Sequence, residues 1–119
     1  MSATILDLVG DVGWESAAAQ SLSSVYVPPT ITATWVRCAA SRAIVVDCRD
    51  HWEEGLVVLE RLRSAEYGEQ RLVVTERESA GDHRRAYEFG ATRVVVMSLG
   101  EQAHARVLSI VDEQDGQAP

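Results

Sequence analysis

The chain has 119 residues, of which 46% are hydrophobic and 24% are charged, and its formal net charge is −7. This length and composition are typical of one compact globular domain with a single core, and they exclude a disordered chain. All eleven basic residues are arginine because the chain contains no lysine, and the acidic balance argues against a general nucleic-acid surface.

The chain lacks an apolar run long enough to span a membrane, and it does not begin with the basic and apolar pattern of a secretory signal. We therefore expect a cytoplasmic protein. Cys38 and Cys48 lack the spacing of a metal site and a partner pattern for a disulfide, so we expect them to be small buried residues.

Strand-like and helix-like segments alternate along the chain. The predicted strands cover residues 3–9, 25–27, 43–46, 71–75 and 93–97. Three of them are continuous apolar runs, "AIVV", "LVV" and "VVVM", which is typical of strands that are covered on both faces. The predicted helices cover residues 14–22, 34–40, 55–63, 79–89 and 101–111. The fourth helix has the clearest ends, because Ser79 and Asp82 resemble a capping box and Gly90 follows Phe89.

This alternation predicts an α/β fold of the doubly wound, flavodoxin-like class, with a five-stranded parallel sheet in the order 2-1-3-4-5. We expect one domain over residues 1–111, followed by a polar tail or linker over 112–119. In such sheets ligands bind at the carboxyl ends of the strands. Asp11, Asp47, Thr75 and Met97 follow or end predicted strands, so we expect them at one edge of the sheet.

Several motifs together resemble the receiver domains of response regulators. They are "IVVD" ending at Asp47, "GLVVLERLR" starting at Gly55, "LVVT" ending at Thr75, and "AYEFGA" at residues 86–91. The resemblance covers over half of the chain, from residue 43 to about residue 111. It implies that Asp47 is the phosphoacceptor and Thr75 the switch hydroxyl. It also implies a Mg²⁺ site formed by Asp11, Asp47 and the backbone carbonyl of Arg49, consistent with the preference of Mg²⁺ for oxygen ligands.

The chain departs from the receiver pattern where the chemistry is most demanding. Met97 stands at the position of the family's lysine, and Ser98 replaces the proline that follows it. Only Asp11 remains of the usual acidic pair, since Gly10 is beside it and Asp7 is predicted to lie deeper in the first strand. A missing cation removes stabilisation of the transferred phosphoryl group. Three arginines are candidates to replace it: Arg49, Arg77 and Arg93.

We therefore expect a degenerate receiver, or pseudo-receiver, that acts in signalling mainly through protein–protein interaction, is not an enzyme, and has impaired or lost phosphorylation at Asp47. One alternative is a competent receiver that a histidine kinase phosphorylates on Asp47. Another is a small flavodoxin-like domain that binds a ligand, although no glycine-rich phosphate loop supports it. Asp47 could also simply begin a loop, and Asp11 could cap the first helix.

The expected partners are a signalling protein, such as a histidine kinase, or an attached output domain; we expect no nucleic acid and no membrane. A homodimer is also expected through the face of the fourth helix, fifth strand and fifth helix. That face should carry Arg84, Arg93, Arg106, Glu88 and Glu101, with Val94 and Leu99 at its centre.

The aromatic residues and histidines give weaker signals. Trp14 and Trp35 are expected to pack in the core or between helices, and His83 and His104 to lie on the surface. The loop "DHWEE" at residues 50–54 favours a solvated loop over a metal site, and Trp52, if exposed there, would indicate partner binding.

Overall fold

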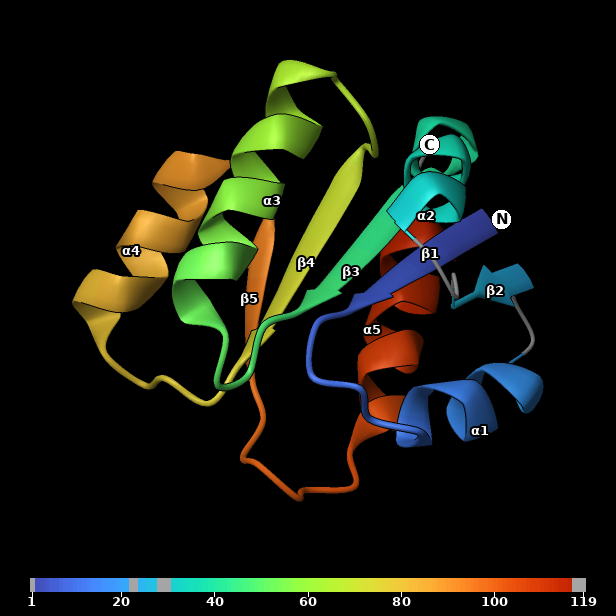
Figure 1. Ribbon diagram of the computed structural model, residues 1–119. Helices are drawn as coiled ribbons and strands as arrows, with labels where there is room; N and C mark the ends of the chain where they lie inside the picture. Colours follow the sequence, from blue (N-terminus) through green and yellow to red (C-terminus); the bar gives the residue numbers. More distant parts are fainter. Residues whose placement is uncertain (1, 22–23, 28–30, 117–119) are drawn as a thin grey trace.

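Strands and helices alternate throughout the computed structural model, which describes residues 2–21, 24–27 and 31–116 (Figure 1). The strands are β1 (Ser2–Asp7), β2 (Ser24–Tyr26), β3 (Ala43–Asp47), β4 (Gln70–Thr75) and β5 (Arg93–Val96). The helices are α1 (Gly13–Ala19), α2 (Ile31–Ala40), α3 (Trp52–Ser64), α4 (Ala80–Phe89) and α5 (His104–Gly116).

All strand pairings are parallel, and the order is β2-β1-β3-β4-β5, which confirms the predicted fold. Asp47 is in register with Asp7 on one neighbouring strand and with Val74 on the other. Thr75 follows Val74 at the end of β4. The last residues of the three central strands therefore meet at the same edge of the sheet.

The sheet is buried between two layers of helices (Figure 1). Helices α1 and α5 cover one face, where the core contains Ile5, Trp14, Val45, Val74, Met97, Val107 and Leu108. Helices α2, α3 and α4 cover the other face, where the core contains Leu6, Cys38, Val46, Trp52, Leu56, Leu59, Leu62 and Ala86. Covering both faces explains the continuous apolar runs in the sequence.

The two cysteines are free and buried, as the sequence predicts. Burial raises the pKa of the Cys38 thiol to about 11 and that of Cys48 to about 12. Both therefore behave as small apolar residues at neutral pH and not as nucleophiles.

Some elements have different ends from those predicted. Strand β1 ends at Asp7 instead of residue 9, because the Asp7 carboxylate accepts hydrogen bonds from the N–H groups of Val9 and Gly10 and turns the chain. Helix α5 continues to Gly116, into the segment expected to be a polar tail. Residues 117–119 of that segment, and residue 22 at the expected end of the first helix, lie outside the described residues.

The predicted cap of α4 is confirmed. The Ser79 hydroxyl accepts a hydrogen bond from Asp82 N–H, and the helix ends at Phe89 before Gly90, whose φ is 121°. In the part of the chain that the structure describes, none of the helices combines the length and the apolar character needed to cross a membrane.

Candidate functional site: a closed carboxylate cluster

The carboxylate of Asp47 is fully enclosed at the end of β3, with 0% of the residue exposed. Its Oδ1 accepts hydrogen bonds from Arg49 N (3.2 Å) and Nε (3.0 Å). Its Oδ2 accepts from Arg49 Nη2 and from Trp14 Nε1, both at 2.7 Å. Protein donors therefore satisfy both oxygens of this carboxylate.

A tight turn after β3 directs the Arg49 side chain back over Asp47. His51 N–H donates to the Cys48 carbonyl at 2.9 Å, which closes the turn, and Asp50 has the left-handed φ of 62°. Aspartate tolerates this conformation better than most residues. The Asp50 N–H donates to Glu76 Oε2 at 2.8 Å. This bond connects the turn after β3 to the loop after β4.

The guanidinium of Arg49 joins three loops at this edge. Besides Asp47, its Nη2 contacts Asp11 Oδ2 at 2.8 Å and its Nη1 donates to the Ser98 carbonyl at 3.1 Å. The side chain is only 1% exposed. Its hydrogen bond with Asp47 raises the pKa of Arg49 further, although burial acts in the opposite direction. The positive charge is therefore permanent.

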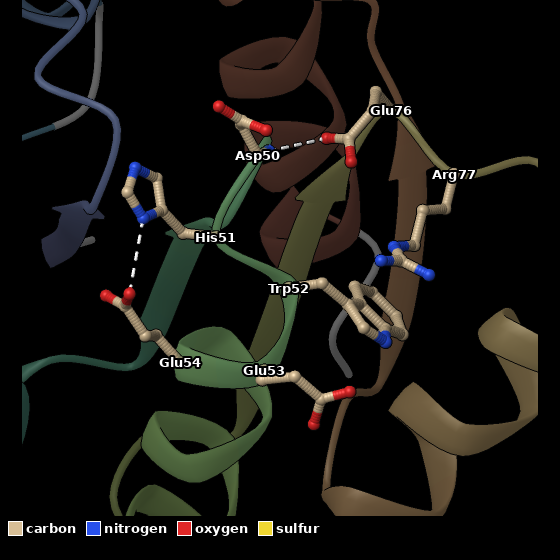
Figure 2. Close-up of a pocket in the computed structure, with 7 residues that line it drawn as sticks. All are labelled: Asp50, His51, Trp52, Glu53, Glu54, Glu76 and Arg77. Atoms are coloured by element: carbon tan, nitrogen blue, oxygen red, sulfur yellow. Dashed lines mark hydrogen bonds and ion pairs between the residues drawn. The ribbon is translucent and has the colours of Figure 1, made fainter.

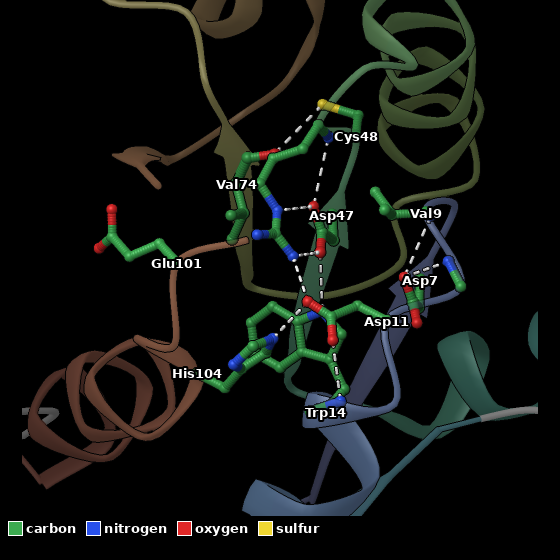
Figure 3. A network of polar contacts seen from close by, with 12 residues as sticks. Asp7, Val9, Asp11, Trp14, Asp47, Cys48, Val74, Glu101 and His104 are labelled. Atoms are coloured by element: carbon green, nitrogen blue, oxygen red, sulfur yellow. Dashed lines mark hydrogen bonds and ion pairs between the residues drawn. The ribbon is translucent and has the colours of Figure 1, made fainter. Parts of the chain in front are cut away.

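Asp11 is the second carboxylate of the cluster, which Figure 3 shows together with Asp47, Trp14 and His104. It accepts hydrogen bonds from Gly13 N–H at 2.9 Å and pairs with His104 Nε2 at 2.7 Å. Burial alone would raise the pKa of Asp11, but the bonds from Gly13, Arg49 and His104 outweigh burial and lower it to about 2. The His104 ring in turn packs edge-on against Trp14, with ring centroids 4.6 Å apart.

Asp7 lies at the level of Asp47 and not deeper in the strand, which corrects the sequence-based expectation. Its Oδ1 accepts the N–H groups of Val9 and Gly10. Burial, and to a smaller extent the nearby charge of Asp47, raise the pKa of Asp7. The usual acidic pair is thus replaced by two carboxylates at separate positions, one turning the chain and one bound to Arg49.

The structure brings Thr75 to the same edge as Asp11 and Asp47, but its hydroxyl oxygen accepts a hydrogen bond from the loop that follows β4. Thr75 is buried, and its Oγ1 accepts a hydrogen bond from Arg77 N–H at 3.1 Å. Met97, at the position of the family's lysine, is 0% exposed and fills the core between β5 and α5.

The carboxylates in this arrangement do not fit a Mg²⁺ ion. The Oδ2 atoms of Asp11 and Asp47 both contact the same guanidinium nitrogen of Arg49, so the oxygens that would bind a metal already bind a cation. Among the described residues, no group of three His, Cys, Asp or Glu side chains is placed to hold a metal ion.

Of the three candidate arginines, only Arg49 reaches Asp47. Arg77 lies over the Trp52 ring, 5.2 Å from its centroid, and Arg93 is exposed at the start of β5, at the opposite edge of the sheet. The sequence-based interpretation gave Arg49 two roles, a backbone carbonyl at the Mg²⁺ site and one of three candidate cations, but it did not predict that its side chain would pair with both carboxylates. The sequence signal for this pairing was the position of Arg49 two residues after Asp47, in a chain that contains no lysine.

One further expectation was wrong, and the condition set for Trp52 is not met. His104 was expected on the surface but is 4% exposed, because it begins α5 facing Gly13 and Asp11. Trp52, whose exposure would have indicated partner binding, is also only 4% exposed, since it packs beneath Arg77 at the start of α3. Trp14 does pack in the core as expected, but it also donates to Asp47.

No protein-family model matches this sequence, and no curated protein matches it either. The structure, however, resembles solved response regulators. An orphan response regulator of H. pylori is 12% identical with a TM-score of 0.67, over 96% of this chain and 95% of that chain. An atypical orphan response regulator, described as having a phosphorylation-independent regulatory mechanism, is 10% identical with a TM-score of 0.70, over 99% and 98%.

A response regulator from Burkholderia multivorans is 20% identical with a TM-score of 0.67, over 100% of this chain and 99% of that chain. At such identities the likeness concerns the fold, and it shows that this chain has the flavodoxin-like fold of response regulator receiver domains.

Proposed function

We propose that this chain is a pseudo-receiver, a cytoplasmic signalling domain that acts through protein–protein interaction without turnover and whose phosphorylation at Asp47 is impaired or lost. The observation that supports it is the Arg49 guanidinium, which closes the Asp47 carboxylate. A carboxylate nucleophile must present a free oxygen to the incoming phosphoryl group. Here that oxygen is buried and bound to Arg49 and Trp14.

Opening the site for phosphoryl transfer would require Arg49 to leave. Its side chain would lose hydrogen bonds to Asp47, Asp11 and the Ser98 carbonyl together, and two carboxylates would remain without their shared cation. Met97 offers no cation to replace it. The cost of leaving buried charges unpaired therefore opposes phosphorylation.

The same contacts supply a fixed signalling conformation. Through Ser98, Arg49 connects Asp47 to the loop between β5 and α5 without any phosphoryl group. The atypical orphan regulator with a phosphorylation-independent mechanism supports such a use of this fold. The partners would be a signalling protein, such as a histidine kinase, or an attached output domain.

The test is a titration with beryllofluoride and Mg²⁺, followed by amide shifts near Asp47 and Thr75. We expect no saturable shift for the natural chain. Arg49→Ala should bind more strongly if the guanidinium is the obstacle, and Asp47→Asn is the control that removes the acceptor. Saturation of the natural chain at low millimolar Mg²⁺, abolished by Asp47→Asn, would contradict the proposal and favour a competent receiver.

A further inference from the structure

A polar cavity lies beside the closed Asp47 cluster, between the turn after β3 and the loop after β4. It has a volume of about 270 Å³, and Figure 2 shows the side chains that line it. Asp50 and the first turn of α3 form one wall, and Glu76 and Arg77 form the other. None of these side chains contributes to the closed cluster around Asp47.

The indole nitrogen of Trp52 is an unsatisfied donor at this cavity. The Trp52 side chain is almost completely buried, and its Nε1 has no hydrogen-bond partner among the described residues. In Figure 2 this nitrogen is turned toward the side of the Glu53 carboxylate. Buried donors in folded proteins almost always have an acceptor, and this one, which has almost no exposed area, lacks an acceptor among the described residues.

Arg77 covers the indole but is weakly held. Its guanidinium lies 5.2 Å from the ring centroid and pairs with Asp82 at a long 3.4 Å, and its side chain is nearly half exposed. Exposed ion pairs of this kind contribute little, so Arg77 can move aside at low cost. Its movement would uncover the face of the indole ring over which it lies.

The acidic groups of the cavity are only partly neutralised. Glu53 pairs with Arg85 at 3.0 and 3.2 Å, but within the described part of the chain no cation pairs with Asp50 or Glu76. Glu76 accepts only the neutral Asp50 N–H there. The wall between Asp50 and Glu76 therefore has an excess of negative charge.

We propose that this cavity binds a basic segment of a partner protein, with an arginine or lysine side chain between Asp50 and Glu76 and a main-chain carbonyl accepting from Trp52 Nε1. A metal ion alone would leave the indole donor unsatisfied. At this acidic wall a basic segment complements the charge better than a second copy of the chain, whose net charge is −7. The inference goes beyond the proposed function, since it does not depend on whether Asp47 is phosphorylated.

The probe is a short capped peptide of alternating alanine and arginine, compared with the same peptide carrying glutamate in place of arginine. Binding is followed by NMR through the indole N–H of Trp52, which Trp52→Phe identifies by its loss. We expect the arginine peptide to move this resonance downfield to saturation, and the glutamate peptide to leave it unchanged.

Matched variants separate the two contacts. Trp52→Phe keeps an aromatic ring without the donor, and Glu76→Gln keeps the acceptor for Asp50 N–H without the charge. Each should weaken the peptide's affinity about tenfold, as expected for the loss of a hydrogen bond or charge-assisted contact. Because Trp52→Phe has no indole, its affinity is measured from the backbone amide shifts of Asp50 and Glu76. Glu60→Gln, on the exposed side of α3, should bind like the natural chain.

Three results would overturn the proposal: no movement of the indole resonance with the arginine peptide, an unchanged affinity in Glu76→Gln, or the same indole shift produced by Mg²⁺ alone. Circular dichroism of each variant shows that it is folded. The outcome is separate from the beryllofluoride titration, because the Asp47 carboxylate is bound by Arg49 and Trp14 and not by Trp52 or Glu76.

Discussion

At the scale of single residues, the central feature is one arginine that balances two carboxylates. Arg49 is 1% exposed and Asp47 is 0% exposed, so water contributes little to stabilising either charge. Such a pair is favourable only when its geometry and remaining hydrogen bonds are good. Here Trp14 and the Ser98 carbonyl supply those additional bonds.

Replacing Arg49 by methionine should be strongly destabilising because it leaves the Asp47 charge buried without a partner. We expect Arg49→Met to lower the free energy of unfolding by about 3–5 kcal/mol near neutral pH, measured by urea denaturation. The double variant Arg49→Met with Asp47→Asn should recover part of this loss, since it also removes the buried charge. A loss no larger than that of an exposed arginine would contradict this account.

Asp11 should make stability depend on pH in the acid range. Its pKa of about 2 in the folded chain lies below the usual value of 3.8, so the folded state favours the ionised form. This contribution is fully present above the unfolded pKa and is lost as the pH falls through the folded pKa. We expect it to be about 2 kcal/mol, since one pKa unit corresponds to about 1.4 kcal/mol.

The measurement compares urea unfolding of the natural chain and Asp11→Asn at a series of pH values between neutrality and the folded pKa. The comparison is needed because Asp7, whose pKa is raised by burial, contributes with the opposite sign in the same range. The stability difference between the two proteins should shrink as the pH falls. A difference that stays constant would show that the ionisation of Asp11 is not coupled to folding.

The sequence predicted which carboxylates meet, but not what closes them. Asp11 and Asp47 follow apolar strands, so their common edge follows from the topology. The direction of the Arg49 side chain depends on the left-handed φ of Asp50 and on the bond from Asp50 N–H to Glu76. Aspartate is compatible with several turn conformations, so its sequence position does not specify this one.

At the scale of elements, continuous apolar runs predicted the central strands well, because both faces of the sheet are covered. Helix ends were predicted where a side chain caps them, as Ser79 does in α4. Helix ends were missed where tertiary contacts determine them. Helix α5 begins at His104, whose ring contacts Trp14 in α1 and Asp11 in the loop before α1.

The contact between α1 and α5 requires glycine at position 13. A Cβ atom added there would lie 2.5–2.9 Å from three atoms of the His104 ring. Gly13→Ala should therefore displace His104 from Asp11 and lower the free energy of unfolding by about 1–3 kcal/mol, as overpacking does. Urea denaturation measures the loss, and the Trp14 indole resonance should shift because its hydrogen bond to Asp47 adjoins the displaced ring.

Gly81→Ala is the matched control within α4. There the nearest atom to an added Cβ is the Ser79 Oγ at 3.6 Å, which is ordinary contact. Alanine should stabilise this helix by about 0.5–1 kcal/mol through its better propensity. Equal gains in both variants would mean that the His104 ring moves without cost, against the account of the α1–α5 contact.

At the scale of the whole molecule, the two edges of the sheet carry different side chains. The carboxyl edge carries the closed cluster and the Trp52 cavity, while Arg93 lies at the amino edge. In the proposed function Arg49 keeps the loops of the carboxyl edge fixed, so assembly would not depend on opening this site. The face of α4, β5 and α5 would then pair constitutively.

The structure changes which residues form the centre of that face. Val94 is half-buried and packs with the core on the α3 and α4 side, whereas Tyr87 is 49% exposed and Leu99 is 54% exposed. The Tyr87 hydroxyl accepts a hydrogen bond from Val94 N–H at 3.3 Å, which fixes the ring beside β5. Of the charged residues predicted for this face, Arg84, Glu88, Arg93 and Arg106 are exposed and Glu101 is half-buried.

We therefore expect a homodimer without any phosphodonor, centred on Tyr87 and surrounded by arginine and glutamate side chains that meet their opposites across a two-fold axis. Exposed ion pairs alone are too weak to hold it, so the aromatic contact must supply most of the affinity.

Sedimentation at tens of micromolar should show a dimer for the natural chain and a monomer for Tyr87→Ala and Arg93→Glu. Arg61→Glu makes the same charge change on the exposed side of α3 and should leave the dimer intact. A monomeric natural chain, or a dimer that survives both Tyr87→Ala and Arg93→Glu, would exclude this face as the constitutive interface and favour a different protein as its partner.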